Sequence, residues 1–158
     1  MGPILQFFAN NGALLLVNVY AYFAYAGDPA NIRLDYALFA ASEPVVIDVQ
    51  FNYSNMFDAI VDSVYYAMEN IGGHEVGIVV SETGWPSDGG TATTIDNAQT
   101  YITKLIKHVG QGTPKRPGSL ETYIFAMFNE NQKPAGVEQH WGLFYPQKTP
   151  VFPIIFPK

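Results

Sequence analysis

Three short and nearly continuous apolar runs constrain the fold of this 158-residue chain more than any other feature. They cover residues 14–20, 76–82 and 122–128. A half-exposed strand alternates apolar and polar residues, whereas a strand buried on both faces reads as an unbroken apolar run. The three runs therefore predict strands of a parallel sheet that is covered on both faces.

Amphipathic helical patterns separate these runs. Apolar residues recur every three or four positions over 57–68 and over 95–109, and a shorter helix is expected at 3–9. The expected boundaries are a cap at Ser54 or Asn55 with a stop at Gly72–Gly73, and a cap at Thr93 or Thr94 with a stop at Gly110. Alternating helices and strands predict an α/β fold, with residues 1–158 forming a single domain segment.

The connection over residues 21–55 is too long to be a simple loop. Within it, residues 44–51 are expected to form a small hairpin or excursion at one end of the sheet. Such surface elaborations often carry function.

Composition excludes several classes of function. The net charge of −6 and the pI of about 4.8 give no electrostatic basis for binding nucleic acid or an anionic membrane. A basic cluster formed by Lys104, Lys107, Lys115 and Arg116 is interpreted as a solvated loop and helix face. The apolar stretch at 14–19 is far shorter than the roughly 20 residues of a membrane span, and no signal peptide is visible.

Metal and thiol chemistry are not expected either. The chain contains no cysteine, so disulfides and thiol nucleophiles are excluded. His74, His108 and His140 lie far apart and lack the spacing of metal ligands. We therefore expect neither a metal nor another cofactor.

Each apolar run ends in polar residues. The pairs are Asn18 with Tyr20, Ser81 with Glu82, and Asn129 with Glu130. Active sites of parallel α/β proteins are built at the carboxyl ends of strands, so these side chains are expected at a common rim. Strict alternation would place Glu82 on the same side as Ile78 and Val80, Asn18 with Leu16 and Tyr20, and Glu130 with Ala126 and Phe128.

Two glutamates at neighbouring strand ends suggest carboxylate chemistry. Glycoside hydrolysis commonly uses a carboxylate pair, and the 15% of aromatic residues could supply flat faces for sugar rings. Strand-end acids also serve as caps and ion-pair partners, and aromatic residues also fill cores. Glu138 adds a third acid, and Lys133 is a cation that could keep one of them ionised.

Several longer segments resemble one known family. The segment VSETGWPS at 80–87 is similar to the signature of glycoside hydrolase family 17, the plant endo-1,3-β-glucanases. The similarity continues through LVNVY at 16–20 with Tyr22 and Phe23, DYALF at 35–39, FNY at 51–53, FDA at 57–59, ETYIFAMFNENQK at 121–133 and WGLF at 141–144. This chain departs from the family at Leu14, where the family often has proline, at Ala21, where it usually has proline, and at Val49, where it commonly has glycine.

The resemblance implies a (β/α)₈ TIM barrel of which this chain is the C-terminal part, carrying strands six to eight. It implies cleavage of internal β-1,3 bonds of glucans with retention of configuration, and plant defence as a role. Glu82 would be the nucleophile, with Glu130, Lys133 and Glu138 in a supporting network. Asn18, Tyr20, Phe23, Trp85 and Phe144 are the substrate-contact candidates, although Trp85 could instead shape a turn and Phe144 could pack in the core.

The resemblance also implies limits. No residue matches the family's general acid, so the chain alone is expected to be nearly inactive. A partial barrel exposes sheet edges and an inner face, which predicts self-association or pairing with the N-terminal half. The alternatives are a non-catalytic β-glucan-binding or defence-related fragment, and a structural half-barrel unit. Family members are mostly extracellular or vacuolar, and the sequon at Asn52 has meaning only in a secreted protein.

Overall fold

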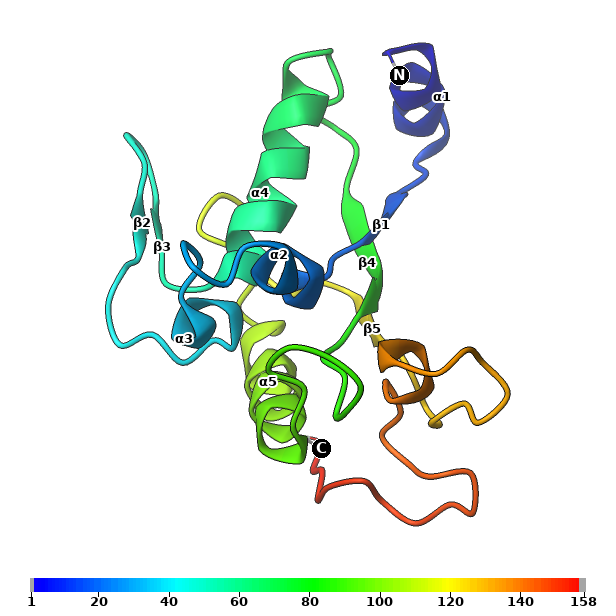
Figure 1. Ribbon diagram of the computed structural model, residues 1–158. Helices are drawn as coiled ribbons and strands as arrows, with labels where there is room; N and C mark the ends of the chain where they lie inside the picture. Colours follow the sequence, from blue (N-terminus) through cyan, green and yellow to red (C-terminus); the bar gives the residue numbers. More distant parts are fainter. Residues whose placement is uncertain (1, 157–158) are drawn as a thin grey trace.

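A three-stranded parallel sheet organises the molecule (Figure 1). In the computed structural model, which describes residues 2–156, its strands are β1 Leu15–Asn18, β4 Ile78–Thr83 and β5 Thr122–Ile124, with β4 in the middle. The other elements are α1 Gly2–Asn11, α2 Ala21–Gly27, α3 Leu34–Ala37, β2 Val46–Ile47, β3 Asn52–Tyr53, α4 Met56–Glu69, α5 Ile95–His108 and the 3-10 helix η1 Val137–Gln139. The prediction of an α/β fold with parallel strands is confirmed.

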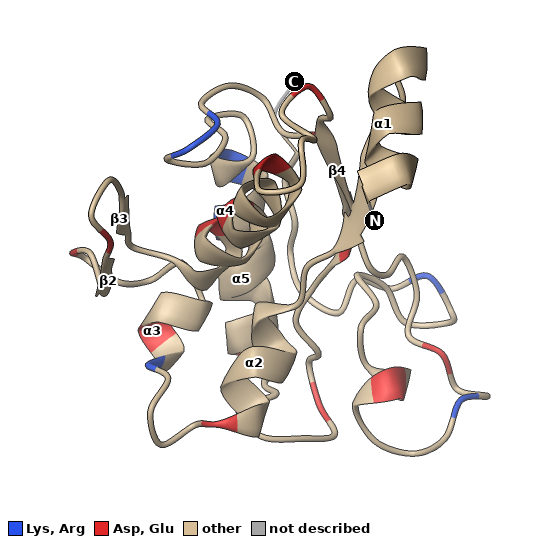
Figure 2. Ribbon diagram, turned by 90° about the horizontal axis from the view of Figure 1, so that it is seen from above, with Lys and Arg blue, Asp and Glu red and all other residues tan. Residues whose placement is uncertain are grey.

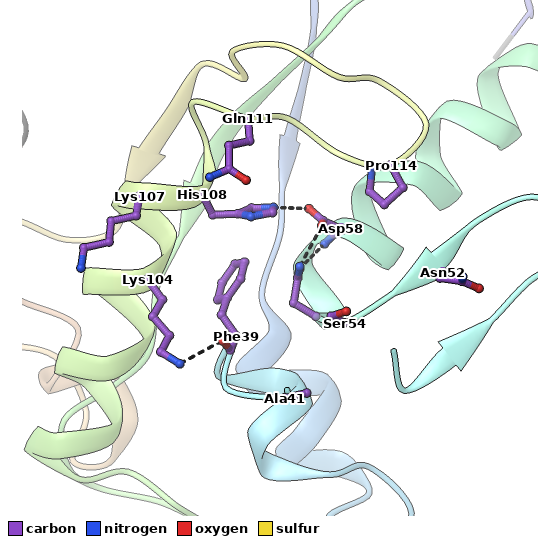
Figure 3. A pocket seen from close by; sticks show the side chains of 11 residues that line it. Phe39, Ala41, Asn52, Ser54, Asp58, Lys104, Lys107, His108, Gln111 and Pro114 are labelled. Carbon is purple, nitrogen blue, oxygen red and sulfur yellow. Dashed lines mark hydrogen bonds and ion pairs between the residues drawn. The ribbon is translucent and has the colours of Figure 1, made fainter. Parts of the chain in front are cut away.

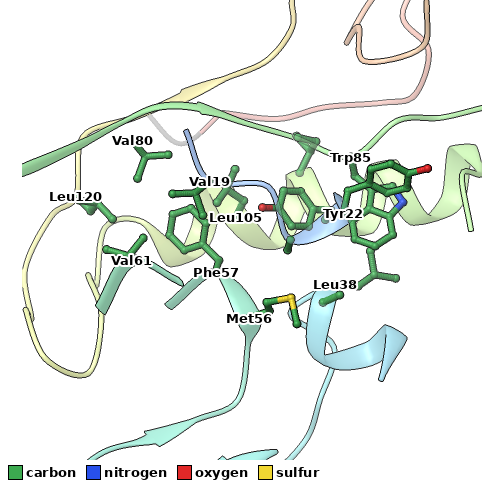
Figure 4. Packing of buried hydrophobic residues seen from close by; sticks show 14 of the residues in the cluster. Val19, Tyr22, Leu38, Met56, Phe57, Val61, Val80, Trp85, Leu105 and Leu120 are labelled. Carbon is green, nitrogen blue, oxygen red and sulfur yellow. The ribbon is translucent and has the colours of Figure 1, made fainter. Parts of the chain in front are cut away.

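The hydrophobic core lies between one face of this sheet and the two long helices, α4 and α5 (Figures 1 and 4). Val80 of β4 is 0% exposed and belongs to the same apolar cluster as Phe57 of α4 and Leu105 of α5. Full burial of a side chain of this kind contributes roughly 1.5–3 kcal/mol. The apolar stripes of the helices thus serve to cover this face.

The opposite face of the sheet is open within residues 2–156. Leu16 on β1 is 64% exposed and Tyr123 on β5 is 56% exposed. A shallow depression over this face is lined by Leu14, Leu16, Val79, Ser81, Glu121 and Tyr123. The prediction of a sheet covered on both faces is therefore wrong for this chain.

Helices α4 and α5 each begin directly after a predicted capping residue. The Asn55 side chain accepts a hydrogen bond from the backbone N–H of Asp58, and the Thr94 side chain accepts one from that of Asn97. Each cap satisfies one of the backbone donors that a helix start leaves unpaired. Of the two caps considered for each helix, the residue next to the first helical residue is the one used.

The third apolar run forms a shorter strand than predicted. Strand β5 ends at Ile124, and residues 126–129 instead pair with 141–144 through backbone hydrogen bonds, such as Leu143 N–H to Ala126 O at 2.9 Å. The expectation that Ala126, Phe128 and Glu130 share one side of a strand is therefore wrong. Glu130 lies on a loop beyond the sheet.

The segment at 21–55 contains more structure than the sequence indicates. Helices α2 and α3 were not predicted, because both are short and neither has a side-chain cap. Strands β2 and β3 form an antiparallel hairpin that projects from the body of the molecule (Figure 1). A hairpin was predicted at residues 44–51, and the structure places its second strand, Asn52–Tyr53, just beyond that range.

Acidic and basic residues are distributed over several elements of the fold (Figure 2). Lys115 and Arg116 each form an ion pair with Glu69 at 2.8 Å, and the Lys115 ammonium lies 3.8 Å from the centre of the Tyr66 ring. The Lys115 side chain is thus mostly buried, and its interpretation as part of a solvated face is wrong.

Two classes of feature have no counterpart in the described residues. None of the helices between residues 2 and 156 combines the length and apolarity needed to cross a membrane. Over the same span, no three His, Cys, Asp or Glu side chains come together as a metal-binding group.

Candidate active site

Glu82 lies near the carboxyl end of β4 and is held by two side chains from the first strand and the residues after it. The amide of Asn18 donates to Glu82 Oε2 at 3.0 Å, and the hydroxyl of Tyr20 donates to the same oxygen at 2.9 Å. Ser81 Oγ donates to Asn18 Oδ1 at 2.7 Å, which orients the Asn18 amide with its N–H toward the carboxylate. Two of the polar strand-end residues therefore hold Glu82 directly, and Ser81 orients one of them.

A β-bulge decides which face of the sheet carries Glu82. The register pairs Val17 with Val80 and then Asn18 with Glu82, so Ser81 is an extra residue on β4. Strand partners point to the same face, so Glu82 lies with Asn18 on the open face and opposite to Val80. The expectation that Glu82 shares a side with Ile78 and Val80 is wrong, because strict alternation ends at the bulge.

Tyr20 is positioned by aromatic packing. Its ring lies 5.1 Å from that of Trp141 and 5.4 Å from that of Phe23, with a third contact to Phe125 at 6.4 Å. Burial raises the pKa of the Tyr20 hydroxyl well above its ordinary value, and the hydrogen bond to Glu82 and the negative charges of Glu82 and Glu138 raise it further. The phenol therefore remains a neutral donor to the carboxylate.

A second group of charges lies on the loop that follows β5 and on η1. Lys133 Nζ is 3.1 Å from Glu130 Oε2 and 3.8 Å from Glu138 Oε2. The same ammonium lies 5.1 Å from the centre of the Phe125 ring, which in turn packs against Tyr20. The predicted trio of Glu130, Lys133 and Glu138 is thus brought together, close to the aromatic residues that position Tyr20.

The predicted sugar-contact residues occupy three kinds of position. Phe23 is 48% exposed and packs against Tyr20, whose hydroxyl donates to Glu82. Phe144 is half-buried and packs against Phe128 at 6.1 Å. Trp85 is only 2% exposed and lies among Tyr22, Tyr25 and Tyr101, with Nε1 donating to Ala92 O.

Trp85 therefore has no face available for a sugar ring, and its prediction as a substrate contact is wrong. The alternative, in which Trp85 shapes the loop after β4, agrees with its packing and its hydrogen bond. Trp141, the central ring of the aromatic group, had no predicted role, and Ser81 was expected at the rim but not as the residue that orients Asn18. The only signal for Trp141 was its place in the WGLF segment.

A separate pocket of about 420 Å³ lies between the start of α4 and the end of α5 (Figure 3). Its buried acid, Asp58, accepts from Asn55 Nδ2 at 2.7 Å and lies 2.6 Å from His108 Nε2. Lys104 donates to Phe39 O at 3.1 Å. These bonds join α4, α5 and the segment after α3, and none of the predicted site residues lines this pocket.

A parallel α/β sheet with an anchored carboxylate, a second carboxylate group and aromatic rings beyond its strand ends has the features of a glycoside hydrolase. The chain belongs to glycosyl hydrolases family 17, whose model matches residues 1–156. The family predicted from the sequence segments is therefore confirmed.

Two relatives with different names have nearly the same sequence identity to this chain. The chain is 56% identical over 156 residues to Lichenase-2 of Hordeum vulgare, covering 99% of this chain and 50% of the relative. It is 55% identical to a glucan endo-1,3-beta-glucosidase of Vitis vinifera, covering 99% of this chain and 46% of that protein. The chain thus spans about half the length of the curated relatives it matches.

Solved structures give the same picture. A structure from a study of two plant β-glucan endohydrolases with distinct substrate specificities superposes with a TM-score of 0.96 at 56% identity, covering 98% of this chain and 51% of the other. The β-1,3-glucanase and allergen CJP38 of Cryptomeria japonica pollen superposes with a TM-score of 0.93 at 55% identity, covering 98% and 49%.

Proposed function

We propose that this chain is the C-terminal part of a retaining endo-1,3-β-glucanase, contributing strands six to eight of a (β/α)₈ barrel, with Glu82 as the nucleophile. The observation that carries the proposal is the double anchoring of one Glu82 oxygen by Asn18 and Tyr20. Because both donors reach Oε2, the second oxygen, Oε1, is left to attack. The family assignment supports the substrate class, a β-1,3-glucan.

The reaction follows from the retaining mechanism. Oε1 of Glu82 attacks the anomeric carbon while the glycosidic C–O bond breaks, and the departing oxygen takes a proton from a general acid. Water then attacks the same carbon, loses a proton to that residue, and releases Glu82. The resemblance assigns the general acid to no residue of this chain, and loss of acid assistance reduces rates by about 10²–10⁴.

Supporting roles fall to the neighbouring residues. Lys133 lies between Glu130 and Glu138 and offsets their negative charge, which limits electrostatic repulsion of the Glu82 carboxylate. Phe23 offers an exposed ring beside Tyr20 for contact with a glucose unit, and Phe144 is a second candidate. In this proposal the protein acts outside the cell or in the vacuole, and one relative is named a basic vacuolar isoform in Nicotiana tabacum.

The test is laminarin hydrolysis by the chain alone and after addition of the N-terminal half of a family-17 relative. We expect little turnover alone and measurable release of reducing ends from the mixture. Glu82→Gln should reduce the activity of the mixture to background with an unchanged circular dichroism spectrum. Glu75→Gln is the control, because Glu75 is an exposed acid just before β4, at the opposite end of that strand from Glu82.

Three results would separate the alternatives. Equal activity of wild type and Glu82→Gln would remove Glu82 as nucleophile. Binding of glucan by an inactive mixture would favour a non-catalytic binding fragment, and absence of binding would favour a structural unit. Lichenan belongs in the assay as a second substrate, because the relatives at 56% and 55% identity are named for different glucans.

A further inference from the structure

The hairpin of β2 and β3 carries an acceptor sequence for N-linked glycans that no part of the proposed site uses. Asn52, Tyr53 and Ser54 form an Asn-x-Ser sequon, and it is the only one in the 158 residues. Tyr53 is buried, whereas Asn52, one residue earlier in the strand, points to the opposite side and is exposed. The acceptor side chain is thus accessible in the folded protein.

The surroundings of Asn52 leave room for a large polar group. In Figure 3 the Asn52 side chain points away from Asp58 and His108, and no interaction joins it to the other residues drawn. Asn52 is one of the residues that line the pocket of about 420 Å³, but the bonds there join His108 to Asp58 and Lys104 to Phe39, so a glycan on Asn52 would leave these bonds in place.

The hairpin also presents apolar side chains next to the acceptor. Ile47 is the strand partner of Asn52 and is 79% exposed, and Val49 in the turn is 100% exposed. Directly opposite residues of an antiparallel pair share one face, with Cβ atoms about 4.5–5.5 Å apart. The first sugar on Asn52 would therefore lie beside Ile47, and exposed apolar strand residues are sites of unwanted association.

We propose that Asn52 is an N-glycan acceptor and that the glycan covers the exposed apolar residues of β2 and its turn; this rests on the extracellular or vacuolar location in the proposed function. The donor is a lipid-diphosphate-linked oligosaccharide. The Asn52 amide nitrogen bonds to the anomeric carbon, the glycosyl–phosphate bond breaks, the lipid diphosphate leaves, and a base of the transferase takes the amide proton.

Expression of the chain behind a secretion leader in plant cells tests the acceptor, and a second sequon appended at the C-terminus reports entry into the secretory pathway. We expect a glycopeptide at Asn52 in wild type and in Ser54→Thr, and its loss in Ser54→Ala. An unmodified Asn52 in a protein whose appended sequon carries glycan would overturn the assignment. Such a result would leave the glucanase proposal intact, because no step of this test measures hydrolysis.

Binding of an apolar dye tests the covering role. Ser54→Ala protein should bind more dye than the glycosylated wild type, and this difference should disappear when both proteins also carry Ile47→Thr and Val49→Thr. The open sheet face is the same in wild type and Ser54→Ala, each with and without the two threonine substitutions. Dye bound to that face therefore contributes equally to all four measurements. Equal dye binding with and without the glycan would contradict coverage of the hairpin.

Discussion

At the scale of single residues, the position of one acid depends on one inserted residue. Ser81 shifts the register of β4 against β1, and this shift turns Glu82 from the helix-covered face to the open face. Asn18 and Tyr20 then satisfy one carboxylate oxygen from the neighbouring chain segment. The role of nucleophile proposed for Glu82 requires such fixed geometry, because misplacement of a reacting group by about 1 Å can cost a hundredfold in rate.

A buried tyrosine gives a residue-scale prediction about pH. The pKa of Tyr36 is raised from 10.0 to about 12, mainly by burial and to a smaller extent by the negative charge of Asp58. The folded state therefore holds this proton more tightly than the unfolded state. The contribution of protonated Tyr36 to the free energy of unfolding is fully present below pH 10. It is lost as pH rises toward 12, at up to about 1.4 kcal/mol per pH unit.

Tyr36→Phe isolates this effect. The Tyr36 hydroxyl is buried and has no hydrogen-bond partner within residues 2–156, so its removal should change the free energy of unfolding at pH 7 by less than about 1 kcal/mol. Between pH 9 and 11 the variant should lose less stability than wild type, as measured by urea unfolding. Parallel declines in the two proteins would contradict the raised pKa.

At the scale of elements, short-range signals place the long helices and long-range contacts place the loops. The caps of α4 and α5 act within three residues, which is why the sequence predicts them. The loop after β5 depends instead on Gly84 and Gly142. A Cβ atom at Gly84 would overlap the carbonyl oxygen of Phe125, and one at Gly142 would overlap the backbone N of Asn129.

The cap of α5 predicts a modest and specific loss of stability. Thr94→Ala removes the acceptor for the Asn97 N–H and should lower the free energy of unfolding by about 1 kcal/mol. Thr94→Ser keeps a hydroxyl and should stay close to wild type. Thermal unfolding of both variants gives the comparison, and an equal loss in the two would exclude capping as the cause.

The close approach at Gly142 predicts a larger effect. Gly142→Ala should lower the free energy of unfolding by about 1–3 kcal/mol or more, because backbone atoms must move to admit the methyl group. Gly110→Ala is the matched control, since nothing lies within 4 Å of a Cβ at that position. Urea unfolding should give a lower free energy of unfolding for Gly142→Ala than for Gly110→Ala. Equal values would show that the backbone of the loop after β5 can move at little cost in free energy.

At the scale of the whole molecule, the fold leaves apolar surface uncovered. Strands β1 and β5 are the edges of the three-stranded sheet in the described part of the chain, and Leu16 and Tyr123 lie exposed on its open face. The relatives are about twice as long as this chain. In the proposed barrel, the inner face and both edges belong against the other strands.

The isolated 17.4 kDa chain is therefore expected to self-associate. Leu16→Lys should shift the sedimentation profile toward monomer without loss of core packing, because Leu16 is already exposed. Ile95→Lys, at an exposed apolar position on α5, should leave the profile unchanged. A monodisperse monomer for the wild-type chain would contradict the prediction.

The sequence alone determined the features that depend on neighbours in the chain. The apolar runs located β1 and β4, the helical periodicity and capping residues located α4 and α5, and the polar residues at the ends of the runs located Glu82 and its two anchors. The resemblance of the segment at 80–87 identified the family. Periodicity, capping and turn chemistry act over a few residues, so one sequence is sufficient to read them.

Only the tertiary structure decided how these parts face one another. The orientation of Glu82 depends on a register shift between strands, and its bond to Asn18 joins residues 64 positions apart. The burial of Trp85 depends on rings from α2 and α5, and the open face of the sheet depends on which strands are present. Such contacts bring together residues distant in the chain, and no local pattern specifies their geometry.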